Sequence, residues 1–113
     1  MGRSDRDGPG GAPWQQEEAD VATDTDHKPV PPRRYKVLLL NDDYTTMEFV
    51  VQILVDVFHH EHDEAVEIML NVHHQGVGVA GVYSREVAET KVARAIDLAR
   101  QSEFPLRCTM EPE

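Results

Sequence analysis

The chain has 113 residues, of which 40% are hydrophobic, and its formal net charge at pH 7 is -10. This length predicts a single domain with one modest core, and the acidic balance argues against nucleic-acid binding, which needs clustered Lys and Arg. The single cysteine, Cys108, permits no intrachain disulfide, as is typical of a reducing compartment. No apolar run could span a membrane, and the N-terminal residues lack the apolar region of a signal peptide. We therefore expect a cytoplasmic protein without a membrane or nucleic-acid partner.

The first 33 residues differ in composition from the rest of the chain. They are rich in Gly, Pro, Asp and Glu, and Trp14 is their only aromatic residue. Such a segment buries too little apolar surface to offset its ordering entropy, so residues 1–33 are predicted to be a disordered N-terminal extension. The extension is either an inert tail or a flexible arm that contacts a partner, with Trp14 as a possible anchor. Residues 34–113 are predicted to form the folded domain.

The folded part opens with a strand and a helix. Residues 34–40 end in an apolar run typical of a buried strand, and the polar residues 41–44 are typical of a turn. Thr45 and Glu48 match the T-x-x-E capping box, which predicts that a helix begins there. Apolar residues then recur at helical spacing: Met47, Val50, Val51, Leu54 and Phe58.

A polar corner at residues 59–63 precedes a second predicted helix. Gly76 is suited to end that helix in the left-handed conformation. The apolar residues that share one helical face are Ala65, Ile68, Met69 and Val72. Residues 77–83 then predict a second strand, which Gly78 and Gly81 loosen.

The rest of the chain predicts one more helix and one more strand. Ser84 is a suitable N-cap for the third helix. Its apolar stripe consists of Ala88, Val92, Ala95, Ile96 and Ala99. A last strand, at about residues 106–110, follows Pro105. The order β-α-α-β-α-β predicts an α+β fold, a two-layer sandwich with three helices on one face of a small three-stranded sheet.

Two groups of polar residues are candidates for binding. Asn41, Asp42 and Asp43 form either an ordinary turn or a site for a cation, because carboxylate and amide oxygens accept several hydrogen bonds. Met69 and His73 are four residues apart and so share one face of the second helix. They are either a core methionine and a helix-end histidine or part of the same site.

Other reactive side chains carry weaker signals. His59, His60 and His62 form a histidine-rich corner, but Glu64 stands where a zinc-protease H-E-x-x-H motif needs its second histidine. We expect a solvated corner there, with incidental metal binding left open. Cys108 is predicted to be a small core residue. No metal site and no cofactor are predicted.

Acidic residues open the third predicted helix, in the run from Glu86 to Lys91. Acidic side chains near a helix N-terminus complement the helix dipole. The same exposed face could also serve as a docking patch for another protein, so both interpretations stand.

Several short stretches occur together in one order along the chain. They are Tyr35-Lys36-Val37, Asn41-Asp42-Asp43-Tyr44-Thr45, Met47-Glu48-Phe49-Val50, Met69-Leu70-x-Val72-His73, Gly81-Val82-Tyr83, Glu86-Val87-Ala88-Glu89-Thr90-Lys91 and Pro105-Leu106. Together they resemble ClpS, the adaptor family of the Clp ATP-dependent protease, and the resemblance covers the chain from Pro31 to Glu111. The resemblance implies an antiparallel sheet and an adaptor rather than an enzyme.

The resemblance also implies a function. ClpS proteins bind substrates that carry a destabilising N-terminal residue, an N-degron, and deliver them to the N-terminal domain of a hexameric AAA+ unfoldase of the ClpA or ClpC type. The unfoldase feeds the ClpP peptidase. By this resemblance the accepted N-terminal residues are Leu, Phe, Tyr and Trp. We expect a monomer.

Residue roles follow from the same resemblance. It implies that the substrate α-amino group is bound by Asn41, Asp42, Asp43 and His73, and that the unfoldase docks near Glu86 and Lys91. Met47 is the implied gatekeeper, which would reject stiff β-branched side chains. The implied side-chain pocket consists of Thr45, Met47, Val50, Met69, Val72 and Leu106.

This chemistry suits a free N-terminus, since an ammonium group has three donors and needs several acceptors. An internal peptide lacks the ammonium and would leave those acceptors unpaired, which provides specificity.

The chain departs from the family pattern at a few positions. Thr46 stands where many members have proline, and we expect it to leave the capping box of Thr45 intact.

Two alternative functions remain. One is a metal-dependent hydrolase that uses Asp42, Asp43 and His73. The other is an interaction domain of the same fold that binds the unfoldase without an active N-degron pocket.

Overall fold

The computed structural model describes residues 30–113. Residues 30–33 are exposed and have no regular secondary structure. The rest of the predicted disordered extension, including Trp14, lies outside the described residues.

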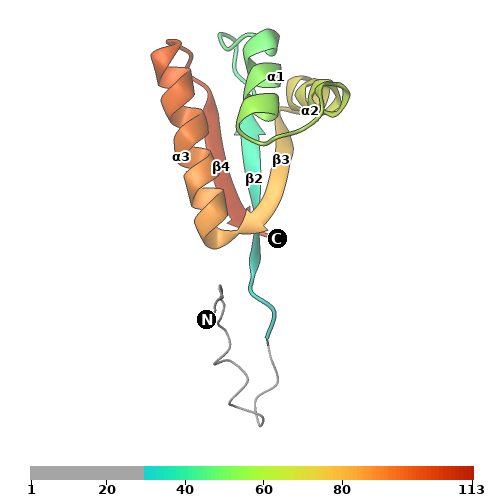
Figure 1. Cartoon of the computed structure of the whole chain (residues 1–113). Coiled ribbons are helices and arrows are strands. Elements are labelled where there is room, and N and C mark those ends of the chain that lie inside the picture. Colours follow the sequence, from blue (N-terminus) through green and yellow to red (C-terminus); the bar gives the residue numbers. More distant parts are fainter. Residues whose placement is uncertain (1–29) are drawn as a thin grey trace, which may run out of the picture. The chain divides into compact units, whose positions relative to one another are not determined.

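A three-stranded antiparallel sheet forms one layer of the domain. It contains β2 (Arg34–Leu40), β3 (Val77–Ser84) and β4 (Arg107–Pro112) in the order β3-β2-β4 (Figure 1). The apolar run at the end of β2 explains its central place, because Val37 and Leu39 are fully buried. Ala80 in β3 is left without a partner on β2, since Val37 pairs with Gly81 and Leu38 pairs with Val79.

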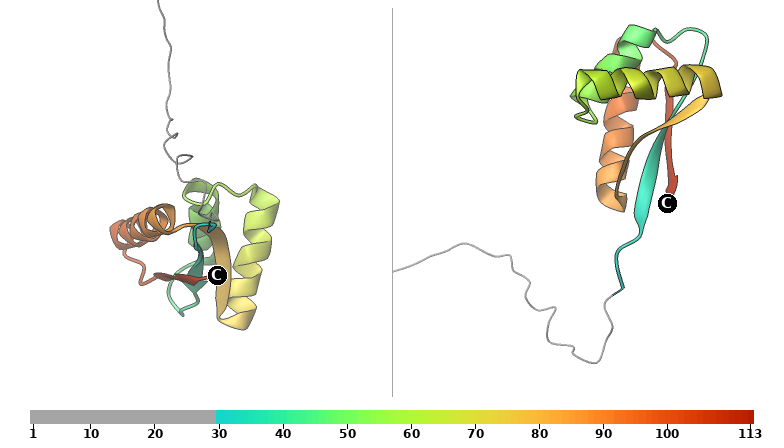
Figure 2. Two further views of the ribbon diagram at one scale, coloured as in Figure 1. Left: turned by 90° about the horizontal axis from the view of Figure 1, so that it is seen from below. Right: turned by 90° about the vertical axis from the view of Figure 1, so that its right-hand side faces the viewer.

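Three helices form the second layer: α1 (Met47–Asp56), α2 (His62–Gln75) and α3 (Arg85–Gln101). Figure 2 shows α1 and α3 on one side of the strands, with α2 beside β3 and running across the direction of α3. The predicted α+β sandwich, with three helices on an antiparallel sheet, is therefore confirmed. The small buried residues Ala88, Ala95 and Ala99 of α3 allow this helix to lie close to the sheet.

The predicted start of α1 is wrong by one residue. The N-cap is Thr46, whose hydroxyl accepts a hydrogen bond from the Phe49 N–H at 3.1 Å. The hydroxyl of Thr45 instead donates to a carboxylate oxygen of Asp42 at 2.7 Å. The side chain of Thr45, which the T-x-x-E pattern assigned to the helix N-cap, therefore forms its hydrogen bond within the loop. Thr46 does not preserve a capping box at Thr45; it is the cap itself.

The other helix ends agree with the sequence. Gly76 ends α2 with φ of 87°, in the left-handed region. Ser84 caps α3 and accepts from the Val87 N–H at 3.4 Å. Phe58 lies beyond the end of α1 but is buried, so it contributes to the core from the corner that leads to α2.

Candidate functional site

A cavity of about 350 Å³ opens where the loop after β2 and the start of α1 meet the last turns of α2. It is lined by every residue predicted to bind the substrate except Leu106: Asn41, Asp42, Asp43, Thr45, Met47, Val50, Met69, Val72 and His73. Tyr44 and Thr46 also line it and were not predicted. Their position between predicted lining residues, in the run from Asn41 to Met47, is the sequence feature that could have predicted them. We call this space the loop–helix cavity.

The end of α2 holds the loop against the helix. The N–H of Asn41, the first residue after β2, donates to the carbonyl of Gly76 at 2.9 Å. A Cβ at Gly78 would lie 2.6 Å from Val72 Cγ2, so the glycine permits α2 to approach β3 closely. Because His73 lies in the last turn of α2, these two features bring it to the same cavity as Asn41.

Asp42 organises the loop. One carboxylate oxygen accepts from the N–H groups of Tyr44 at 2.8 Å and Thr45 at 2.7 Å, and the other accepts from the Thr45 hydroxyl. Burial by itself raises the pKa of Asp42, but these hydrogen bonds and the charge of Arg107 outweigh it and lower the pKa below its usual value. Asp42 is therefore ionised at neutral pH, and about one of its acceptor positions remains free for a ligand.

The backbone of Asn41 is fixed on both sides. Its N–H bonds to Gly76, and its carbonyl accepts from Arg107 Nη2 at 3.3 Å. Among residues 30–113, neither the Asn41 side-chain amide nor the His73 ring forms a hydrogen bond to another residue. Both lining groups therefore keep their acceptor atoms available to a ligand.

Apolar side chains form the other part of the loop–helix cavity. Val50, Met69 and Val72 are buried, whereas Met47 is 44% exposed. Met47 therefore lies at the rim and the other three lie deeper. Two methionines give this wall adaptable shape, because the unbranched thioether has several rotatable bonds.

Leu106 does not line the loop–helix cavity. It is only 6% exposed and borders a separate pocket of about 430 Å³ beside Phe104, Cys108 and the end of β2. The prediction that placed it in the side-chain pocket is not matched by this geometry. Its neighbour Arg107 reaches the site instead, through the carbonyl of Asn41. Sequence reasoning missed Arg107, since 66 residues separate it from Asn41 and no local pattern links them.

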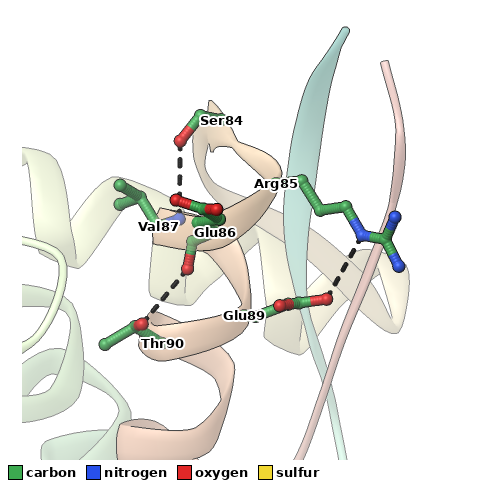
Figure 3. A network of polar contacts seen from close by, with 6 residues as sticks. All are labelled: Ser84, Arg85, Glu86, Val87, Glu89 and Thr90. Carbon is green, nitrogen blue, oxygen red and sulfur yellow. Dashed lines mark hydrogen bonds and ion pairs between the residues drawn. The ribbon is translucent and has the colours of Figure 1, made fainter.

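The predicted docking residues Glu86 and Lys91 line a second opening of about 350 Å³ on α3. Val57, Val87, Thr90 and Arg94 complete it, and we call it the α3 groove. Figure 3 shows its edge, where the Thr90 hydroxyl donates to the Glu86 carbonyl at 3.1 Å and the Arg85–Glu89 pair lies apart from them.

Lys91 is engaged inside the domain. Its Nζ donates to the Val57 carbonyl at the end of α1 at 2.6 Å and lies 5.6 Å from the centroid of the Tyr83 ring. Lys91 thus caps the C-terminal end of α1 and joins it to α3. Within the described part of the chain Glu86 forms no ion pair, so its carboxylate is the more accessible charge of the two.

The described residues offer little for metal or nucleophilic chemistry. Among residues 30–113, no three His, Cys, Asp or Glu side chains are grouped so that they could hold a metal ion. That range includes the set Asp42, Asp43 and His73 of the hydrolase alternative. His60 contacts Glu64 Oε1 at 3.0 Å and the Ala80 carbonyl, so it ties the corner to β3. Burial raises the pKa of Cys108 to about 12, as expected of a core thiol.

No helix within residues 30–113 is both long and apolar enough to cross a bilayer.

Comparison with known proteins gives one consistent result. Residues 30–109 match the family model described as "ATP-dependent Clp protease adaptor protein ClpS". The chain is 52% identical to an ATP-dependent Clp protease adapter protein ClpS of Hyphomonas neptunium, over 99% of this chain and 98% of the relative. It is 58% identical to the protein of the same name in Desulfatibacillum aliphaticivorans, over 83% of this chain and 90% of the relative.

Among solved structures, the chain is similar to Agrobacterium tumefaciens ClpS2 bound to L-phenylalaninamide. The TM-score is 0.71 and the sequence identity 46%, over 74% of this chain and 100% of that one.

Proposed function

The chain belongs to the ClpS family of ATP-dependent Clp protease adaptor proteins, and from that membership we propose that the loop–helix cavity holds the N-terminal residue of proteins delivered to the Clp protease. Its relatives are named as adapters and not as enzymes, which confirms the prediction that the chain is not an enzyme. As an adaptor, it works with the Clp protease machinery and its substrates.

The observation that carries this proposal is the division of the loop–helix cavity into a polar and an apolar part. A substrate ammonium has three donors. The Asn41 amide oxygen, the free acceptor position of Asp42 and a neutral His73 ring nitrogen supply three matching acceptors from two elements. Asp43 adds negative charge from the same loop. An acetylated or internal residue lacks the ammonium and would leave these groups unpaired.

The apolar part of the cavity defines the proposed side chain. The related Agrobacterium tumefaciens protein was solved with L-phenylalaninamide, which carries a free α-amino group and a large apolar side chain. A cavity of about 350 Å³ suits such a residue. We therefore assign Leu, Phe, Tyr and Trp as the accepted N-terminal residues, with the pocket formed by Val50, Met69 and Val72.

The expected affinity is modest. Burial of the side chain contributes about 1.5–3 kcal/mol, and each hydrogen bond to a charged group contributes about 1.5–3 kcal/mol. Loss of rotational freedom and ordering of the peptide oppose both contributions. The result corresponds to dissociation constants on the order of micromolar, weak enough for an adaptor to release its cargo.

Met47 is the proposed gatekeeper. It stands at the rim of the cavity with 44% of its surface exposed, next to the buried Val50. A β-branched Val or Ile is broad next to its backbone and stiff about χ1, so it would contact Met47 before it entered the cavity.

The α3 groove is the proposed docking site for the N-terminal domain of a ClpA- or ClpC-type unfoldase. Glu86 offers an unpaired charge there, while Lys91 would share its ammonium between the partner and the Val57 carbonyl. Residues 1–33 are proposed to engage the unfoldase during delivery. A cytoplasmic monomer remains our proposal for location and assembly.

Fluorescence polarisation with short labelled peptides tests the cavity. Peptides that begin with Leu or Phe should bind, and the same peptides with an acetylated N-terminus or an N-terminal Met should not. The Asn41→Ala variant should lose the binding. Failure of every peptide to bind the parental protein would refute the proposal and favour an interaction domain that lacks an active N-degron pocket.

A further inference from the structure

A smaller pocket of about 260 Å³ adjoins the loop–helix cavity, and nothing in the function proposed above uses it. It is lined by Met47, Glu48, Val51, His62 and Met69, and we call it the second pocket. Met47 and Met69 line both spaces. A ligand that leaves the cavity over these two methionines therefore meets the second pocket next.

Helix geometry explains why the two methionines are shared. On α1, Val50 and Val51 follow Met47 by three and four residues. Seen along the helix axis, their side chains therefore lie on opposite sides of the Met47 side chain. Val50 lines the loop–helix cavity and Val51 lines the second pocket. On α2, His73 lies one turn after Met69, whereas His62 lies two turns before it. The two spaces therefore follow one another along α2, from its C-terminal end towards its N-terminal end.

The spacing matches every second residue of an extended peptide. The middle of the segment from His62 to Met69 lies about 8 Å along the helix axis from the middle of the segment from Met69 to His73. Two residues of extended chain advance about 7 Å, and their side chains point to the same side. If the first side chain enters the loop–helix cavity, the third reaches the second pocket, and the second points away.

The lining of the second pocket has a definite chemistry. Val51 and the two methionines provide apolar surface, and Glu48 places an exposed carboxylate at the first turn of α1. His62 is the other titratable residue of the lining, and Asp63 and Glu64 follow it in the first turn of α2. Lys and Arg are absent from this lining. Such a surface suits a side chain with a long aliphatic stem and a positive end.

We propose that the second pocket is a subsite for the third residue of the substrate, and that it favours Lys or Arg there. The inference rests on the proposed binding of the N-terminal residue in the loop–helix cavity. The aliphatic stem lies on Val51 and the methionines, while the cationic group faces Glu48. Acidic third residues are disfavoured, because they meet the same carboxylate.

Polarisation with four peptides tests the subsite: Leu-Ala-Ala, Leu-Ala-Lys, Leu-Ala-Glu and Leu-Lys-Ala, each extended by one common neutral tail. We expect Lys at the third position to bind about threefold more tightly than Ala, in keeping with an exposed ion pair, and Glu to bind more weakly than Ala. The second position should have a smaller effect, since its side chain points away from the pocket.

Two variants separate a subsite from general attraction to an acidic protein. Glu48→Gln should abolish the preference for Lys at the third position, and Glu48→Lys should reverse it. The control Glu67→Gln makes the same change of charge on α2, but Glu67 lies about 200° round the helix from Met69, so the preference should persist.

If Leu-Ala-Ala binds, two results would overturn the subsite alone. One is an equal preference for Lys at the second position, and the other is a preference for Lys at the third position that survives Glu48→Gln. Loss of all binding, including that of Leu-Ala-Ala, would overturn the proposed function and the subsite together.

Discussion

Asp42 connects the architecture of the loop to its proposed chemistry, and its substitution should affect both. Three hydrogen bonds end on its carboxylate, from the N–H groups of Tyr44 and Thr45 and from the Thr45 hydroxyl. Hydrogen bonds to charged groups are worth about 1.5–3 kcal/mol each, but the loop is partly exposed and water can replace some of them. We expect Asp42→Ala to lower the free energy of unfolding by about 2 kcal/mol.

The effect on binding should be separable from the effect on stability. Asp42→Asn retains the shape of the side chain and one acceptor oxygen for the two N–H groups, but it removes the charge. Loss of one charge-assisted bond to the substrate ammonium should weaken binding of a Leu-initiated peptide by roughly 10- to 100-fold. Thr45→Val is the matched control, because it removes one bond from the loop and leaves the charge of Asp42 in place.

Urea denaturation gives the free energy of unfolding of each variant, and peptide polarisation gives its affinity. The stability that Asp42 provides should also depend on pH. Its pKa is lowered in the folded state, so its contribution is complete at neutral pH and is lost as the pH falls below about 4. Parental affinity in Asp42→Asn, with the loop intact, would refute the assigned role in binding the ammonium.

Three further predictions concern the rim of the cavity, the end of α1 and the histidine acceptor. Met47→Ala should admit peptides with N-terminal Ile or Val; continued rejection of both in polarisation assays would contradict the gatekeeper role. Lys91→Met should lower the free energy of unfolding by about 1–2 kcal/mol, because the carbonyl of Val57 loses its donor, while Glu89→Gln at an exposed ion pair should change it by less than about 0.5 kcal/mol. His73→Phe should weaken binding of a Leu-initiated peptide by roughly 10-fold, because it removes one acceptor of the substrate ammonium; parental affinity of this variant in polarisation assays would count against His73 as an acceptor.

Short-range patterns in the sequence were sufficient for the elements and for most candidate residues. The apolar run before Leu40 predicts a buried strand, and that strand is the centre of the sheet. Gly76 and Ser84 predict a helix end and a helix start, since each acts on backbone groups within a few residues. The cap of α1 was missed because two adjacent threonines compete, and the carboxylate of Asp42 binds the first of them.

Tertiary packing decided which of these residues meet. The bond between the Asn41 N–H and the Gly76 carbonyl brings His73 to a loop about 30 residues earlier in the chain. Two other long-range hydrogen bonds place Arg107 at the loop and engage Lys91 at the end of α1. Leu106 lines a different pocket. Periodicity and capping describe backbone groups only a few residues apart. Contacts between distant segments depend on how helices and sheet pack, which no local pattern contains.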